Sequence, residues 1–405
     1  MRSTLSPRRL CLLPLLVGAL ACGDDAAPAM DSSISNDARA LGDAADARDA
    51  IADASGADEA LADQRADDAE ADSGGEPDAG EPGRVEALVL TGHLGRRMLS
   101  CDRGASFVYD ISVDDDARCW NMAGGEGPDC DHHPTSNNGV AFGNGAFITT
   151  AGWGSVEDDE GGLFLSNGSS DWRQREPGTT FNGVSFGNGV FVANGGEARI
   201  SRDGGESWTA QRLDFRPSRG AYFYAGRHVL LRDQPGEVWI SEDDGDTFAQ
   251  PEDASDCAFE GGMGGVGGND SLLIYSNRAD RVCASTDGGR TWTGADLPEN
   301  LASNLVFDGE AFLAVGRDTR YRSVDGLEWA EEASDVPRDL RRIRRFDDGT
   351  LIGVVNAWGG FYERSGLYLS EDGGLTWTAT AASDALNGHP IRGAAVGSVD
   401  ASLCE

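Results

Sequence analysis

Short apolar runs separated by turn-forming residues recur along residues 85–405 and predict a chain built from β-strands. Two units match almost residue for residue: NGVAFGNGAFI begins at Asn138, and NGVSFGNGVFV begins at Asn182. Each reads as a strand, an Asn-Gly hairpin turn and a second strand. Weaker copies have turns at Asp308-Gly309 and Asp348-Gly349. Because strand signals return at short, regular intervals, the sequence predicts an all-β domain.

A second pattern, Ser-x-Asp-Gly-Gly-x-Thr-Trp, interrupts the same region seven times. The three fullest copies are SRDGGESW at 201–208, STDGGRTW at 285–292 and SEDGGLTW at 370–377. The four variant copies are SCDRGASF at 100–107, SNGSSDW at 166–172, SEDDGDTF at 241–248 and SVDGLEW at 323–329. We call these seven segments the repeat loops.

The residue types of the repeat loops indicate a tight turn between two strands. Ser and Asp side chains can hydrogen-bond nearby backbone N–H groups, and Gly provides the positive φ that such turns need. The closing Trp or Phe is expected to start the next strand as a buried anchor. The carboxylates to which we assign this structural role are Asp102, Asp203, Asp243, Asp287, Asp325 and Asp372.

The spacing of the repeat loops predicts a β-propeller. Most of the loops start 35–47 residues apart, and only the first gap is longer, at 66 residues. A period near 40–45 residues is typical of four-stranded propeller blades, so seven loops predict seven blades. Val85–Thr91 reads as the second strand of a blade that lacks a preceding first strand. Residues 390–397 read as the first strand of a blade, and no second strand follows them. We therefore expect the C-terminus to supply the inner strand of the first blade and to close the ring.

On the residues S-x-D-G-G-x-T-W, the chain resembles the Asp-box, or BNR-repeat, β-propellers. This superfamily includes sialidases, sortilin-type receptor domains and photosystem assembly factors. The resemblance covers residues 85–405. It implies a fold but no particular activity, because enzymes and non-enzymes share this loop.

The N-terminus predicts export. Residues 1–21 combine a basic start with an apolar run, as in a signal peptide, and the segment ALAC ending at Cys22 is similar to a bacterial lipobox. The departure is Ala19, where a lipobox usually has Leu, and an ordinary secretory signal is the alternative. We expect a lipid on Cys22 and attachment to the cell envelope, at the outer membrane.

Residues 22–84 predict a disordered Ala- and Asp-rich linker, because they contain almost no large apolar side chains. The whole chain has a net charge of −36 and no lysine. Such acidity argues against nucleic acid and against an anionic lipid surface as partners. We expect a monomer that contacts the membrane only through its N-terminal lipid.

Apart from Cys11 in the signal segment and Cys22, six cysteines remain, an even number that favours disulfides in an exported domain. The expected pairs are Cys119–Cys130, Cys257–Cys283 and Cys101–Cys404. The first pair lies beside His132 and His133, so a metal site is the weaker alternative there. We otherwise expect no metal and no cofactor.

We number the strands of a blade 1 to 4 from the inside outward. The 1–2 turns and the repeat loops, which join strands 3 and 4, should share one face of the propeller. The 2–3 connections and the 4–1 connections to the next blade should share the other face, which we call the loop face. The long connections occur on the loop face, at 115–138, 153–162 and 358–366. Exposed rings beside guanidinium groups can hold a sugar or a peptide. The candidate ligand-binding residues are His93, Trp120, Trp153, Arg219, Arg342, Trp358, Tyr362 and Arg392.

The favoured function is a non-catalytic binding or scaffold module that recognises a glycan or a protein through the loop face. The alternative is a sialidase-like exo-glycosidase that uses the arginines at the mouth of the central channel. A sialidase usually carries a Phe/Tyr-Arg-Ile-Pro motif, and Phe215-Arg216-Pro217 lacks the Ile. Tyr362-Glu363 resembles a Tyr–Glu nucleophile pair only in composition, so the sequence favours the non-catalytic function.

Overall fold

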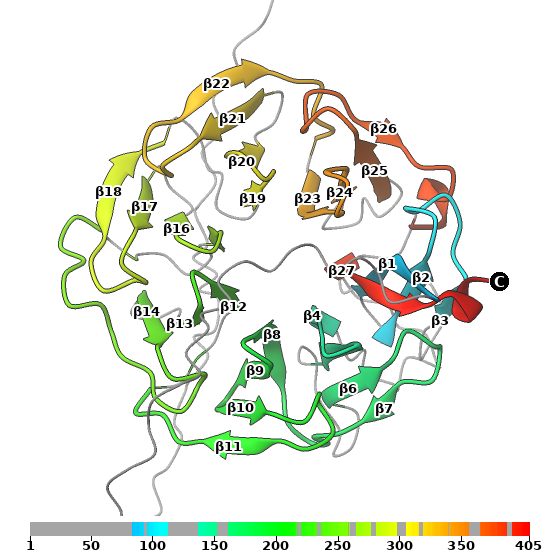
Figure 1. Cartoon of the computed structure of the whole chain (residues 1–405), viewed down its shortest axis with the longest axis horizontal. Helices are drawn as coiled ribbons and strands as arrows, with labels where there is room; N and C mark the ends of the chain where they lie inside the picture. Colours follow the sequence, from blue (N-terminus) through cyan, green and yellow to red (C-terminus); the bar gives the residue numbers. More distant parts are fainter. Residues whose placement is uncertain are drawn as a thin grey trace, which may run out of the picture. The chain divides into compact units, whose positions relative to one another are not determined.

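The computed structural model describes residues 83–92, 95–111, 137–151, 161–215, 217, 220–232, 236–257, 259, 265–276, 281–297, 305–315, 319–338, 340–355, 365–386 and 391–405. These residues belong to one compact unit and form seven antiparallel sheets around a common axis (Figure 1). The predicted all-β, seven-bladed propeller is therefore confirmed. In the described part of the chain, no helix is long and apolar enough to cross a membrane.

Each sheet forms one blade, in which the first-named strand lies nearest the axis and the last lies at the rim. Blade 1 consists of β27 (Ile391–Asp400), β1 (Arg84–Gly92), β2 (Arg97–Ser100) and β3 (Tyr109–Ile111). Blade 2 consists of β4 (Asn137–Gly143), β5 (Ala146–Ala151), β6 (Gly162–Ser166) and β7 (Arg173–Gln174). Blade 3 consists of β8 (Phe181–Gly187), β9 (Val190–Gly195), β10 (Ala198–Ser201) and β11 (Thr209–Gln211).

The second half of the propeller ring repeats this order. Blade 4 consists of β12 (Ala221–Tyr224), β13 (Arg227–Arg232) and β14 (Glu237–Ser241). Blade 5 consists of β15 (Gly265–Gly268), β16 (Leu273–Ser276), β17 (Arg281–Ser285) and β18 (Thr293–Asp296). Blade 6 consists of β19 (Leu305–Phe307), β20 (Phe312–Val315), β21 (Thr319–Ser323) and β22 (Ala330–Ala333). Blade 7 consists of β23 (Leu340–Arg345), β24 (Leu351–Val355), β25 (Gly366–Ser370) and β26 (Thr378–Ala379), followed by the 3₁₀ helix η4 (Ser383–Leu386).

Blade 4 departs from the expected four strands because its outer strand is reduced to one bridge. Ile240 and Ala249 exchange both backbone hydrogen bonds, each 2.9 Å long. Two residues further along, Pro251 has no N–H to donate, so it cannot continue the ladder. The chain instead crosses to blade 5, where the N–H of Glu252 donates to the carbonyl of Arg290.

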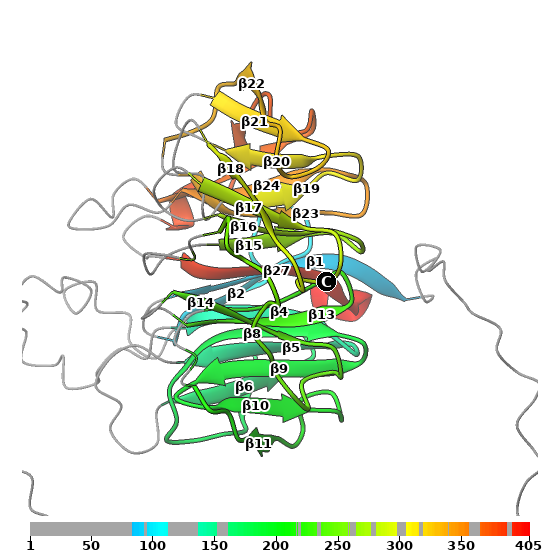
Figure 2. The ribbon, with the colours of Figure 1, turned by 90° about the vertical axis from the view of Figure 1, so that its left-hand side faces the viewer.

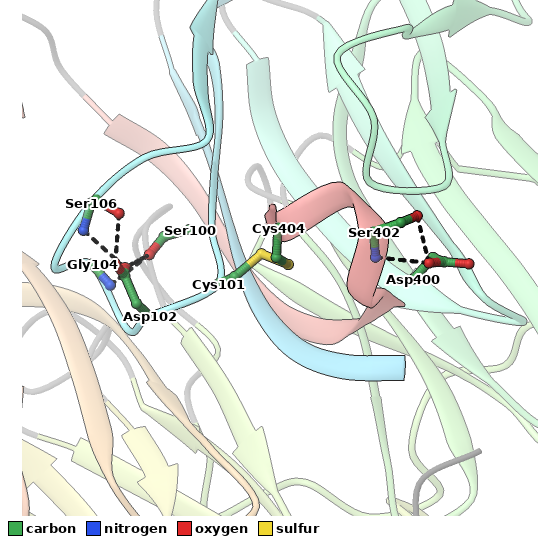
Figure 3. The surroundings of a disulfide bond; sticks show 8 residues. All are labelled: Ser100, Cys101, Asp102, Gly104, Ser106, Asp400, Ser402 and Cys404. Carbon is green, nitrogen blue, oxygen red and sulfur yellow. Dashed lines mark hydrogen bonds between the residues drawn. A yellow bond between two sulfur atoms is a disulfide. The ribbon is translucent and has the colours of Figure 1, made fainter. Parts of the chain in front are cut away.

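The C-terminal strand closes the propeller ring. β27 pairs antiparallel with β1 from Arg84–Asp400 to Gly92–Ile391, and β23 of blade 7 lies beside it on the other side. A disulfide joins Cys101, just after β2, to Cys404 in the 3₁₀ helix η5 (Ala401–Cys404), as Figure 3 shows. This predicted pair is therefore confirmed.

The second predicted disulfide is also confirmed. Cys257, which follows blade 4, bonds Cys283 of β17 in blade 5, and both side chains are buried in the core between these blades. The predicted lipidation site Cys22 and the predicted pair Cys119–Cys130 lie outside the described residues.

Five of the seven repeat loops, those that begin at residues 100, 201, 241, 285 and 370, share one hydrogen-bond pattern, illustrated by residues 285–292. The hydroxyl of Ser285 donates to the carboxylate of Asp287 and accepts from the N–H of Gly289, both at 2.8 Å. The same carboxylate accepts from the N–H and the hydroxyl of Thr291. Partial burial opposes ionisation, but the hydrogen bonds from Thr291 and Ser285 outweigh it and lower the pKa of Asp287 to about 2.

In two of the three full loops, the second glycine, Gly205 or Gly289, packs against the preceding blade. A Cβ built at Gly289 would lie 2.1 Å from Ile240 Cδ1, so only glycine fits there. The ring of Trp292 is 4% exposed, and its Nε1–H donates to the carbonyl of Gly289 at 2.9 Å. These two loops thus fasten neighbouring blades together, and glycine at φ +91° also permits the turn.

Replacing Asp287 with alanine is expected to destabilise the fold by about 2 kcal/mol, because three hydrogen bonds to a charged acceptor are lost. Urea unfolding at pH 7 measures this change. Asp296→Ala is the matched control, since Asp296 is exposed and forms only a surface ion pair with Arg281, worth less than about 1 kcal/mol. Equal losses in the two variants would contradict a structural role for the loop.

Candidate functional site

The two faces of the propeller carry different connections. β1 starts at Arg84, on the same face as the repeat loops, and runs to Gly92 on the loop face; Figure 2 shows this strand lying along the axis. The Ser and Asp side chains of the repeat loops form hydrogen bonds within their own loop, as in residues 285–292. Candidate ligand-binding groups therefore have to be sought on the loop face and around its end of the axis.

The inner strand of blade 7 carries four arginines in six residues, LRRIRR. Alternation would place Leu340 and Ile343 on opposite sides of the sheet, yet both are buried in the same cluster. A β-bulge between Arg341 and Arg344 resolves this conflict, and Arg342 within it takes φ +54°. Such a left-handed bulge residue is usually glycine, so this arginine sits in a sparsely populated backbone conformation.

The bulge brings Arg342 and Arg344 to the seam with blade 1, where β27 contributes Arg392. The Nε–H of Arg344 donates to the carbonyl of Ala394 at 2.6 Å, and the Nε of Arg342 lies 3.5 Å from the carbonyl of Ile391. Both bonds reach the edge of β27 that does not pair with β1. We call Arg342, Arg344 and Arg392 the arginine cluster.

The arginine cluster concentrates positive charge near the axis. Enclosure by the surrounding strands is the main cause that lowers the pKa of Arg342, to about 9, and the charges of Arg392 and Arg344 add to it. Arg344 is exposed to solvent, but the protein around the axis displaces part of its water and lowers its pKa, while Tyr224 and Tyr222 of β12 favour its charged form. These tyrosines belong to blade 4, across the propeller ring from β27 (Figure 1).

Two members of this cluster form no ion pair with a carboxylate of the described residues. Among the described residues, no ion pair involves Arg342 or Arg344, although fourteen ion pairs hold other arginines of the domain. Like charges held together in a strongly acidic protein are costly unless something anionic compensates them. The arrangement can therefore accept a carboxylate, a phosphate or a sulfate.

The structure describes two of the eight predicted ligand-binding residues. Arg342 and Arg392 lie on adjacent inner strands at the loop-face end of the axis, close enough to influence each other's charge. The remaining six lie outside the described residues: His93, Trp120, Trp153, Arg219, Trp358 and Tyr362. The segment that carries Trp358 and Tyr362 connects the loop-face ends of β24 and β25.

Sequence reasoning missed three members of this neighbourhood, namely Arg344, Tyr222 and Tyr224. The run LRRIRR gave the only available signal, since a basic inner strand is unusual in an acidic domain. Simple alternation cannot show that Arg342 and Arg344 both reach β27, because the bulge changes the register between them.

The described segments contain no group of three or more His, Cys, Asp or Glu side chains that could hold a metal ion. The alternative metal site at Cys119, Cys130, His132 and His133 lies outside these segments.

No family model and no curated protein matches the chain. Among solved structures, YCF48 bound to D1 peptide is similar over 62% of this chain and 84% of that chain, with 16% identity and a TM-score of 0.48. The GH74 enzyme of Niastella koreensis is similar over 66% of this chain and 44% of that chain, with 15% identity and a TM-score of 0.47. AztD of Citrobacter koseri is similar over 78% of this chain and 98% of that chain, with 9% identity and a TM-score of 0.45. With identities this low, the seven sheets themselves remain the basis for the fold.

Proposed function

We propose that this protein is an exported, non-catalytic Asp-box propeller that binds a glycan or protein partner through its loop face. In this proposal, Cys22 carries the lipid that attaches the chain to the cell envelope, and mass spectrometry of the mature N-terminus tests that step. The repeat loops maintain the fold, and the arginine cluster recognises an anionic group on the partner.

The observation that carries the proposal is the close approach of Arg342, Arg344 and Arg392 at the seam between blades 7 and 1. Arg342 is held in a strained bulge at the loop-face end of the axis, and neither it nor Arg344 has an ion-pair partner among the described residues. Strain of this kind persists when the surrounding structure enforces it, and it is concentrated at functional sites. Planar guanidinium groups bind carboxylate and phosphate oxygens in a bidentate manner.

Replacing Arg342 and Arg392 together with glutamine is expected to weaken binding of the anionic partner at least tenfold, because each charged hydrogen bond contributes about 1.5–3 kcal/mol. The probes are arrays of sialylated and uronate glycans and of peptides with free C-terminal carboxylates. Affinity is then measured by titration at two salt concentrations, since cationic recognition weakens as salt increases.

Arg345→Gln is the matched control for this experiment. Arg345 is exposed and lies on the same strand, but its guanidinium is close to the turn around Gly349 at the opposite face. Its replacement is expected to leave affinity unchanged. If the control variant loses as much affinity as the double variant, overall charge rather than the cluster explains binding.

The alternative, a sialidase-like glycosidase, would require two carboxylates close to the arginines. One would act as the general acid, and the other would assist the nucleophile. Within the described residues, no carboxylate forms an ion pair with Arg342 or Arg344, so the binding function is favoured. Release of a fluorescent phenol from an aryl sialoside by the purified protein would replace the binding proposal with the enzymatic one.

A further inference from the structure

Blade 7 contains a groove of about 600 Å³ on the loop face that is separate from the arginine cluster. Its walls come from the ends of β24 and β25, from the chain after β26, from η4 and from the connection that enters the blade. Pockets of 300–1,000 Å³ are typical of small-ligand sites. The residues that line it are Pro337, Arg338, Val355, Ser365, Tyr368, Ala379, Thr380, Ala381, Ser383 and Asp384.

Local packing fixes two neighbouring groups of this groove. The hydroxyl of Ser383 accepts a hydrogen bond from the N–H of Leu367 at 2.9 Å, so its own proton remains available to donate. A Cβ built at Gly366 would lie 2.8 Å from Ser383 Oγ and 3.0 Å from Tyr368 Cε2. Glycine at this position therefore lets the phenol ring and the serine hydroxyl lie side by side.

The lining combines an aromatic surface with several hydroxyl groups. The ring of Tyr368 is half-buried, and the hydroxyl of Thr380 is enclosed without a hydrogen-bond partner among the described residues. The oxygen of Thr380 has almost no accessible surface, so a ligand in the groove cannot reach it. The hydroxyl of Ser383 and the exposed carboxylate of Asp384 are the groups that remain to hydrogen-bond a ligand.

The charges of the groove favour a neutral ligand. Arg338 and Asp384 are both exposed and of opposite sign, so they cancel, in contrast to the arginine cluster. A carboxylate and a guanidinium on the same groove can hydrogen-bond adjacent hydroxyls of a polyol, as acceptor and donor respectively. Apolar side chains such as Pro337 and Val355 complete a surface that matches the apolar face and polar edge of a sugar ring.

The geometry points to a binding site for a neutral hexose unit in the blade-7 groove. The sugar stacks on Tyr368, while Ser383 and Asp384 hydrogen-bond its hydroxyls. This inference rests on the proposed function, because it makes the loop face a glycan-binding surface and places an uncharged part of the glycan beside the anionic group.

The test is binding of neutral tetrasaccharides, namely cellotetraose, maltotetraose and N-acetylchitotetraose, observed by saturation-transfer NMR and titration calorimetry with the full chain. We expect one of them to bind the wild-type protein. Tyr368→Ala is expected to weaken that binding at least about tenfold, as for an aromatic anchor at the centre of a site. Asp384→Asn keeps the shape of the side chain but removes the charged acceptor, and it is expected to give a smaller loss.

Glu371→Gln is the matched control, because Glu371 is an exposed carboxylate in the repeat loop of blade 7 that does not line the groove. Thermal unfolding of each variant separates lost binding from lost folding, and Asp384→Asn serves if Tyr368→Ala fails to fold. Binding of none of the three sugars, or equal losses in Asp384→Asn and Glu371→Gln, overturns the inference. An effect of the arginine variants on acidic probes alone would leave the proposed function standing while the groove inference falls.

Discussion

Replacing Cys101 and Cys404 with alanine is expected to be among the most destabilising changes in this chain. The disulfide joins residues 303 positions apart, so it closes almost the whole propeller into one loop. In the chain-entropy model, removing such a cross-link costs up to about 5 kcal/mol through the gain in freedom of the unfolded chain. For a domain of this size, that loss lowers the melting temperature by roughly 5–10 °C.

The other disulfide provides the comparison. Cys257 and Cys283 are only 26 positions apart, so the same model gives their cross-link about 3–4 kcal/mol. Urea unfolding of both double-alanine variants, with wild type under reducing and oxidising conditions, measures the order. If the 101–404 variant were as stable as wild type, the long-loop cross-link would contribute nothing. Hydrogen exchange in β27 would then show whether the native strand still closes blade 1.

Lowering the pH from 7 to 4 is expected to cost about 3 kcal/mol of stability through His228 of β13. This side chain is 1% exposed, lies between blades 3 and 4, and has Nδ1 3.2 Å from the hydroxyl of Ser185. Burial lowers its pKa to about 4, although Asp244 and the backbone of Gly187 favour the charged form and Arg202 disfavours it. A difference of about 2.5 pKa units corresponds to that free energy.

The lowered pKa of His228 determines the direction in which stability changes with pH. The unfolded chain binds a proton near pH 6.5, whereas the folded chain does not until about pH 4, so stability is complete above 6.5 and falls between these values. The His228→Gln variant is expected to be less stable at pH 7 but to lose less on acidification. Urea unfolding at several pH values gives both slopes. Identical slopes for the two proteins would show that other groups control the acid response.

Below pH 4, the carboxylates of the repeat loops affect how stability changes with pH. The hydroxyl and N–H of Ser207 lower the pKa of Asp203 to about 2, and Asp287 behaves in the same way. Their contribution is present above the unfolded pKa near 3.9 and is lost as the pH falls toward 2. Because both carboxylates are exposed, solvent screening keeps the pH-dependent part of each contribution below that of the buried His228. The two pH windows therefore separate the histidine from the repeat loops.

Much of the fold could be predicted because its determinants are local. The Ser, Asp and Thr side chains of a repeat loop hydrogen-bond to one another within eight residues. The residues Ser285, Asp287 and Thr291 therefore predict the turn from the sequence alone. The closing strand was also accessible, since an apolar run without a following partner strand must pair elsewhere. Both described disulfides followed once the blades had been assigned.

The rest depends on contacts that sequence patterns do not contain. The bulge at Arg342 changes which side chains of β23 reach β27, and no turn residue marks it. Pro251 ends the outer strand of blade 4 only because it falls opposite Val238 in a register set by Ile240 and Ala249. The blade-7 groove needs η4 and the small size of Gly366, which act across the fold rather than along the chain.

The direction of β1 determines how the domain would carry mechanical load. The chain enters β1 at Arg84 on the repeat-loop face, whereas the arginine cluster and the blade-7 groove lie toward the loop face. Tension between an N-terminal tether and a captured partner would therefore run along β1, parallel to the axis. All the hydrogen bonds between β1 and β27 would then be loaded in shear together instead of being opened one after another. A propeller held in this way should resist pulling far better than the same propeller held by two points on a blade edge, and force spectroscopy with the two attachments can compare them.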